Sequence, residues 1–132
     1  MKTKNIRNAL KAVIEVANIL PAAHENGTTQ ARPYIDVKIA SARRENNLLA
    51  GGAFLREIGA LDVTVCVDEG TYANAASDYA DDIAALFPKG LRIDAPGGVV
   101  VITDVPDVRA GFNADAEYRV PVMVRYEAAP LG

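Results

Sequence analysis

The sequence predicts an α+β fold, a mainly antiparallel or mixed β-sheet with two helices packed on it, in the order α-β-β-α-β-β-β. Two segments repeat their apolar residues at helical spacing, and several others alternate apolar with polar residues. The last three of these segments follow one another with a turn or a loop and no helix between them, which is typical of antiparallel strands. The chain has 132 residues, half of them hydrophobic, so a single domain over residues 1–132 is expected.

The first helix is expected from about Thr3 to Asn18, where Ile6, Leu10, Val13 and Ala17 recur at helical spacing. A proline soon after Asn18 ends it, and the polar stretch AAHENGTTQARP then predicts a loop. Charged residues interrupt the apolar ones, so this segment is interpreted as an amphipathic helix and not as a signal peptide. No apolar run is long enough to cross a bilayer, and no membrane contact is expected.

Two strands are expected next. The stretch PYIDVKIASA alternates Ile35, Val37 and Ile39 with polar residues, which predicts a half-buried strand. A second alternating region runs from about Phe54 to Val67, and Gly59 within it is expected to mark a β-bulge. The residues of this region that face one side together are Leu61, Val63, Val65 and Val67.

The stretch SARRENNLLAGGAF between these strands breaks the alternation and predicts a long flexible arm over about residues 43–53. Leu48 and Leu49 have no periodic partner within the chain, and exposed apolar residues rimmed by charge often mark an interaction site. The alternative is that the arm folds back over its own sheet.

The second helix is expected within DEGTYANAASDYADDIAALFPKG, with Thr71 as its N-cap. Its apolar stripe consists of Ala76, Tyr79, Ala80, Ile83 and Phe87. Three strands follow at about residues 91–94, 99–103 and 116–126, and the loop DVPDVRAGFNAD separates the last two.

The candidate interaction residues lie on the arm and on this helix. Three carboxylates point away from the apolar stripe of the helix, and arginines of the arm are expected to pair with the carboxylates of a neighbouring copy. The interface candidates are Arg43, Arg44, Leu48, Leu49 and Phe54 near the arm, and Asp78, Asp81 and Asp82 on the helix.

No catalytic or cofactor motif is found. Gly97 and Gly98 precede a strand and not a helix, so the stretch APGG predicts a turn and not a phosphate loop. The single histidine, His24, lies in a polar segment and has no serine elbow to work with, so it is interpreted as a solvated side chain. The acidic residues lack the spacing of a calcium loop, and no metal or cofactor is expected. The single cysteine, Cys66, excludes an internal disulfide.

The net charge of −3 is unevenly distributed. Residues 1–66 carry nine Lys and Arg against six Asp and Glu, whereas residues 67–132 carry five against eleven. Chance together with solvated faces is one interpretation, and a subunit with two complementary faces is the other. There is no dense basic stripe, so no sequence-specific nucleic acid partner is expected.

The C-terminal half resembles a phage-encoded family similar to the tail terminator proteins of long-tailed phages. The residues that carry the resemblance are Phe87-Pro88-Lys89-Gly90, Gly97-Gly98, Pro106, and Tyr118-Arg119-Val120-Pro121-Val122 with Tyr126. The stretches RPYIDV and LDVTVCVDEGT extend the similarity over most of residues 32–127.

This resemblance implies a structural protein with no enzymatic activity that forms a ring, a hexamer in the family. Such a ring caps the tail tube, ends tube polymerisation and offers a surface for head attachment, so the partners would be other copies, the tail-tube protein and the head–tail connector. The implied location is the virion tail, with assembly in the host cytoplasm. The alternatives are another neck or head-completion protein, and a small enzyme or ligand-binding domain using Asp104, Asp107 and Arg109.

Overall fold

The computed structural model describes residues 3–24, 32–45, 56–68, 70, 73–114 and 116–130. The chain forms two helices and eight strands in these parts. In chain order they are α1 (Thr3–Ala17), β1 (Ala22–His24), β2 (Tyr34–Glu45), β3 (Arg56–Asp68), α2 (Ala73–Ala85), β4 (Arg92–Ala95), β5 (Gly98–Ile102), β6 (Asp107–Val108), β7 (Phe112–Ala114) and β8 (Glu117–Pro130).

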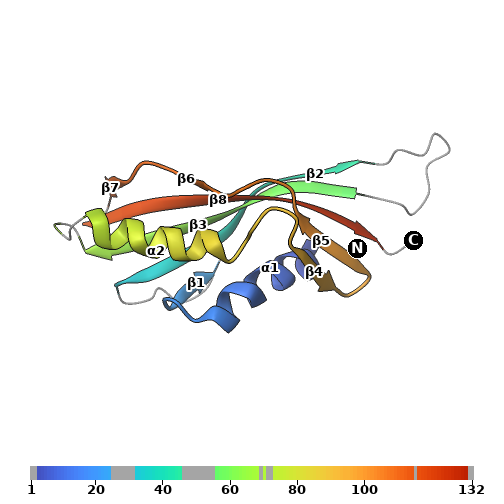
Figure 1. Ribbon diagram of the computed structural model, residues 1–132, viewed down its shortest axis with the longest axis horizontal. Helices are drawn as coiled ribbons and strands as arrows, with labels where there is room; N and C mark the ends of the chain where they lie inside the picture. Colours follow the sequence, from blue (N-terminus) through green and yellow to red (C-terminus); the bar gives the residue numbers. More distant parts are fainter. Residues whose placement is uncertain are drawn as a thin grey trace.

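The sheet is built around β8, its longest strand (Figure 1). The strand order is β1-β2-β3-β8-β5-β4, and β6 and β7 also pair with β8. β3 runs along one edge of β8 from Glu117 to Ala128, while β7, β6 and β5 share the other edge in succession. Every pairing is antiparallel except that of β1 with β2. The predicted α+β class and its mainly antiparallel sheet are therefore confirmed.

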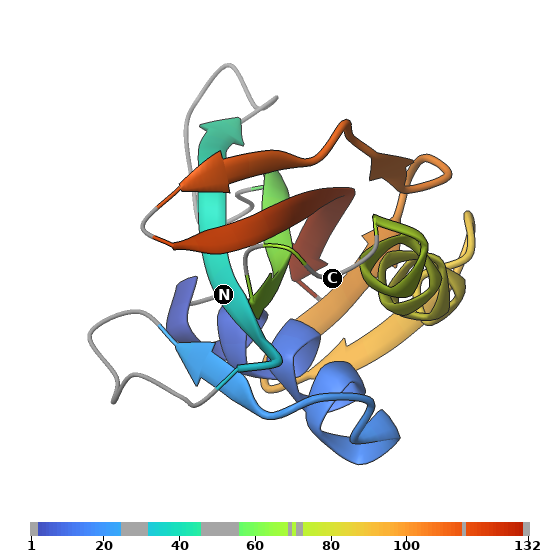
Figure 2. The ribbon, with the colours of Figure 1, turned by 90° about the vertical axis from the view of Figure 1, so that its left-hand side faces the viewer.

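Both helices pack against the same apolar core. α1 contacts β4 and β5, whereas α2 contacts β8, β3 and β6. Viewed along the long axis, α1 lies below the sheet and α2 to its right, with the end of β2 towards the top (Figure 2). The fully buried residues that the strands contribute include Ile35, Val37, Leu61, Val63, Val65, Val100, Ile102, Val122, Val124 and Tyr126.

The first helix follows its prediction with one shift of face. Ile6 and Leu10 are buried as expected, but Ile14 is the third buried residue, while Val13 is only partly buried and Ala17 is exposed. The apolar stripe thus runs in steps of four residues, which places it on one side of the helix. The helix ends at Ala17, and the next residue, an asparagine, has a φ of 49° and donates its backbone N–H to the carbonyl of Ile14.

The alternation of β3 is confirmed, since Leu61, Val63, Val65 and Val67 are all buried on the helix-covered side. The side chains that alternate with the core residues of β2, β3 and β8 face the opposite side, which no helix covers in the described parts of the chain. We call this side the open face. Tyr34 and Cys66 form a small buried cluster there.

The bulge lies in β2 and not at Gly59 as predicted. The register shifts between Ile39 and Ser41, so β2 carries one residue more than β3 at that point. Gly59 has a different function. A Cβ atom at this position would lie 2.6 Å from the Tyr126 hydroxyl and 2.5 Å from the backbone oxygen of Ser41. The missing side chain therefore gives Tyr126 room to reach across β3, where its hydroxyl donates a 2.9 Å hydrogen bond to buried Glu57.

Three short strands lie in segments predicted to be loops. β1 pairs three residues with β2, while β6 and β7 pair two and three residues with β8. Such segments are too short for alternation to be visible, and a neighbouring long strand supplies their pairing. The predicted N-cap, Thr71, lies outside the described residues.

Pro121 occupies the middle of the sheet, where proline is normally excluded because it has no N–H. Its carbonyl accepts the backbone N–H of Arg109, so in an antiparallel strand its nitrogen faces the same edge. Pro121 lies between the part of this edge that pairs with β7 and the part that pairs with β6. The proline therefore costs no ladder hydrogen bond.

Gly59→Ala is expected to destabilise the fold by about 1–3 kcal/mol, the usual cost of overpacking a core, because the new methyl group must displace Tyr126 or the backbone of β2. Urea unfolding would measure the loss. Ser41→Ala, an exposed position on the adjacent strand, is the control and should change stability by less than about 0.5 kcal/mol. Equal stabilities for the two variants would contradict this assignment.

Candidate assembly surface

The two arginines predicted to lie in the arm belong to β2. The strand continues to Glu45, and Arg43 and Arg44 pair with Ile58 and Glu57 of β3. The prediction of an arm beginning at residue 43 is therefore wrong for its first residues. Sequence alternation failed there because the bulge changes the phase of the strand.

The bulge determines where the two arginines point. Before it, the odd-numbered residues of β2 face the core, and after it Ser41 and Arg43 pair with open-face residues of β3. Arg43 therefore lies on the open face. Arg44 takes the opposite side, where its Nε lies 3.6 Å from a carboxylate oxygen of Glu57. Arg44 thus supports the buried Tyr126–Glu57 pair, and Arg43 belongs to the surface.

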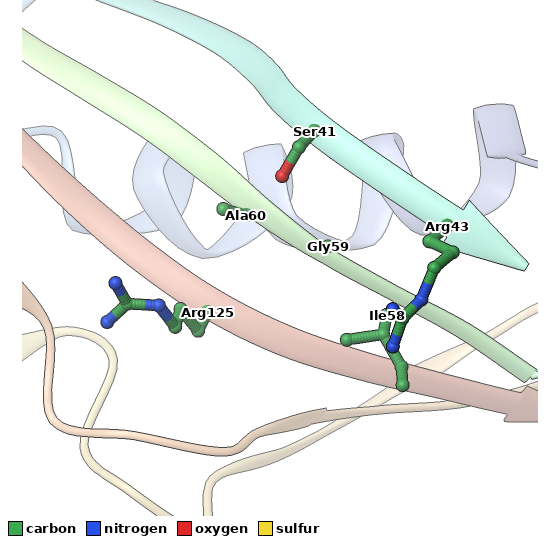
Figure 3. Close-up of a pocket in the computed structure, with 6 residues that line it drawn as sticks. All are labelled: Ser41, Arg43, Ile58, Gly59, Ala60 and Arg125. Atoms are coloured by element: carbon green, nitrogen blue, oxygen red, sulfur yellow. The ribbon is translucent and has the colours of Figure 1, made fainter.

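A hollow of about 290 Å³ opens on the open face beside Arg43 (Figure 3). Small residues of β2 and β3 form its floor, namely Ser41, Gly59 and Ala60. Arg43 and Ile58 border it on one side and Arg125 on the other, while α1 lies behind the sheet in this view. The result is a shallow, partly apolar depression between two guanidinium groups.

Arg125 was not among the predicted site residues. It belongs to β8, where it pairs with Ala60 and donates a 2.9 Å hydrogen bond to Asp107 of β6. The alternation of Val122, Val124 and Tyr126 contained the signal, because it places residue 125 on the face opposite the core. That Arg125 lies near Arg43 follows only from the register of β2, β3 and β8, which the sequence does not show.

The acidic candidates lie elsewhere on the molecule. Asp78, Asp81 and Asp82 are all exposed on the outer side of α2, as predicted. α2 covers one half of the long axis, whereas β2 ends towards the other (Figure 1). The structure therefore does not bring the arginines and these carboxylates together within one chain. Leu48, Leu49 and Phe54 lie outside the described residues.

A cluster of charged side chains around Glu117 connects the strands at the other end of the open face. Glu117, only 4% exposed, accepts hydrogen bonds from Arg32 at 2.9 Å and from Arg119 at 2.8 Å and 3.1 Å. Arg32 also donates to Asp68 at 3.2 Å. The cluster connects the start of β8 with the end of β3 and with the residues before β2.

The hydrogen bonds of this cluster favour the ionised form of Glu117. Burial would raise the pKa of Glu117, but hydrogen bonds from Arg119, Arg32 and Tyr34 outweigh it and hold the pKa below the ordinary value of 4.5. Burial raises the pKa of the Cys66 thiol to about 11, which leaves it protonated and unreactive at neutral pH.

The two acidic residues of the enzyme alternative each contact a neighbouring side chain. Asp104 and Asp107 are exposed; Asp107 is bound to Arg125, and the hydroxyl of Thr103 donates to Asp104 at 3.4 Å. In the part of the chain that the structure describes, no three His, Cys, Asp or Glu residues are grouped to hold a metal ion. Neither described helix is long and apolar enough to cross a membrane.

The fold class is thus an α+β sheet domain with helices on one face. The sequence of the chain matches the model of the phage tail terminator protein family over residues 5–126, and the chain belongs to this family. Membership gives it a structural part in a phage tail and a place in the virion among other phage structural proteins. The resemblance seen in the C-terminal motifs is confirmed.

Solved structures show how widely the fold is shared. One solved structure has a TM-score of 0.80 at 22% identity, over 100% of this chain and 99% of the other. A chain in the virion of a native gene transfer agent particle has a TM-score of 0.62 at 9% identity, over 97% and 96% of the two chains. At these identities the similarity shows the fold alone. No curated protein matches the chain.

Glu117→Gln is expected to lower the free energy of unfolding at pH 7 by about 1.5–3 kcal/mol, the range for hydrogen bonds to a charged group. Because the folded pKa of Glu117 is depressed below 4.5, its ionised form stabilises the fold above that pH, and this stabilisation is lost as the pH falls through the folded pKa. The difference in unfolding free energy between the variant and the native chain should therefore be largest at pH 7 and should disappear in acid.

Urea unfolding at a series of pH values measures this difference. Glu127→Gln is the matched control, because Glu127 forms a half-exposed ion pair with Arg56 worth about 0–1 kcal/mol. A difference for Glu117→Gln that stays constant down to strongly acid pH would exclude the proposed stabilisation by the ionised carboxylate.

Proposed function

We propose that the protein, acting as one domain over residues 1–132, caps the phage tail tube, ends tube polymerisation and forms the surface to which the head is joined. Membership of the tail terminator family over residues 5–126 is the observation that carries this proposal. The partners are further copies of the chain, the tail-tube protein and a head–tail connector, and assembly takes place in the host cytoplasm.

We further propose that the working form is a closed ring, a hexamer as the family resemblance implies. A ring of identical subunits needs two different, complementary patches on each subunit. The distribution of charge supports this requirement. The arginine-bordered hollow and the acidic side of α2 carry opposite charges and lie on different parts of the molecule. The two patches are therefore too far apart to form ion pairs with each other within one chain.

Electron microscopy of the purified chain, alone and mixed with tail-tube protein of the same phage, tests this function. Rings at the ends of tubes, and tubes that stop growing once the chain is added, are the expected result. A chain that stays monomeric and never contacts tube protein would rule the function out.

Leu48→Asp combined with Leu49→Asp is expected to leave the circular dichroism spectrum unchanged and to abolish rings in the same microscopy. The physical reason is that charged side chains cannot be buried in an apolar contact between copies without a large cost. The control is Arg92→Asp, an exposed position on β4. Unfolding of the double variant would instead place the two leucines in the core of their own subunit.

A further inference from the structure

We propose that the hollow between Arg43 and Arg125 is the socket for helix α2 of the next copy, whose carboxylates Asp78, Asp81 and Asp82 pair with the two arginines. This inference rests on the proposed self-assembly and adds which surfaces meet. The occupant of the hollow is a second copy of this chain, and the contact is head to tail.

Shape is the first argument. The floor of the hollow consists of Ser41, Gly59 and Ala60, whose side chains are small or absent, so another backbone can approach the sheet closely. The outer side of α2 has a similar character. Its exposed residues are Asn74, Ser77, Asp78, Asp81, Asp82 and Ala85, all of them short. A helix with short side chains can pack closely against the floor of a shallow depression, whereas long side chains would hold the helix away from it.

Charge is the second argument, and it distinguishes the two helices. The exposed side of α2 carries three carboxylates and no basic residue, whereas α1 carries Lys4, Arg7 and Lys11 against the single acid Glu15. Two guanidinium groups at the rim of the hollow therefore attract α2 and repel α1. Arg125 already binds Asp107, but a guanidinium has several N–H donors and can serve a second carboxylate.

Position is the third argument. The hollow lies on the open face of β2, β3 and β8, while α2 covers the core side of the sheet. One copy cannot fold its own α2 into its own hollow. A contact of this kind is heterologous, so each copy uses its hollow towards one neighbour and its α2 towards the other, which is the type of contact from which closed rings are built.

Charge exchange between two variants tests the proposal. One variant carries Arg43→Glu and Arg125→Glu, and the other carries Asp81→Lys and Asp82→Lys. Each alone has two like-charged surfaces, and its self-association, measured by sedimentation velocity and by ring formation on tail-tube ends, should weaken more than about a hundredfold. An equimolar mixture of the two should restore association, because each hollow then meets a helix of opposite charge.

Controls separate this effect from misfolding. Arg92→Glu with Asp94→Lys reverses two exposed charges on β4, outside the open face and α2, and should leave association unchanged. Arg43→Glu alone keeps the Arg125–Asp107 pair and should still weaken association, with an unchanged circular dichroism spectrum. Ser41→Cys with Ser77→Cys should give a ladder of cross-linked multimers with a short bismaleimide, since buried Cys66 does not react. Either cysteine alone should not.

The outcomes are distinct. Rings that tolerate both charge reversals would overturn the inference and leave the proposed function standing. Weakened variants that mixing does not restore would show that the hollow binds something other than α2, which also overturns it. A native chain that never associates, with or without tube protein, would remove the proposed function itself.

Discussion

The whole structure depends on the pairing of β8 along both of its edges. β3 covers one edge over twelve paired residues, and the other edge is divided among β7, β6 and β5. Val120, Val122, Val124 and Tyr126 point from this strand into the core that both helices cover. Because β8 is the strand that connects the two halves of the sheet, its register sets the position of every other strand.

Two devices hold that register. At one end, buried Glu117 of β8 binds Arg32, which precedes β2, so a slip of β8 would separate a buried carboxylate from this cation. At the other, Tyr126 fills the space that Gly59 leaves free and donates to Glu57. A one-residue slip would move either group to the wrong face of the sheet. The same register brings Arg125 beside Ala60 and Ser41, and so creates the hollow.

Sequence reasoning succeeded where a pattern is long and repeated. The two helices and the alternation of Leu61, Val63, Val65 and Val67 follow from spacing alone, because burial on one side repeats with the period of the backbone. It failed where a tertiary neighbour decides. The strands of two and three residues exist only because β2 and β8 are there to pair with them, and the IASA stretch gives no sign that the bulge follows Ile39. That bulge separates Arg43 from Arg44, and the hollow needs residues from three strands far apart in the chain.

The central claim is that copies meet head to tail, the open face of one against α2 of the next. A cryo-electron microscopy reconstruction of the chain on the end of a tail tube tests it most directly. The account predicts that α2 of each subunit lies in the Arg43–Arg125 hollow of its neighbour, all the way around a closed ring. Subunits that meet through identical patches, or an α2 that faces solvent throughout the assembly, would contradict it.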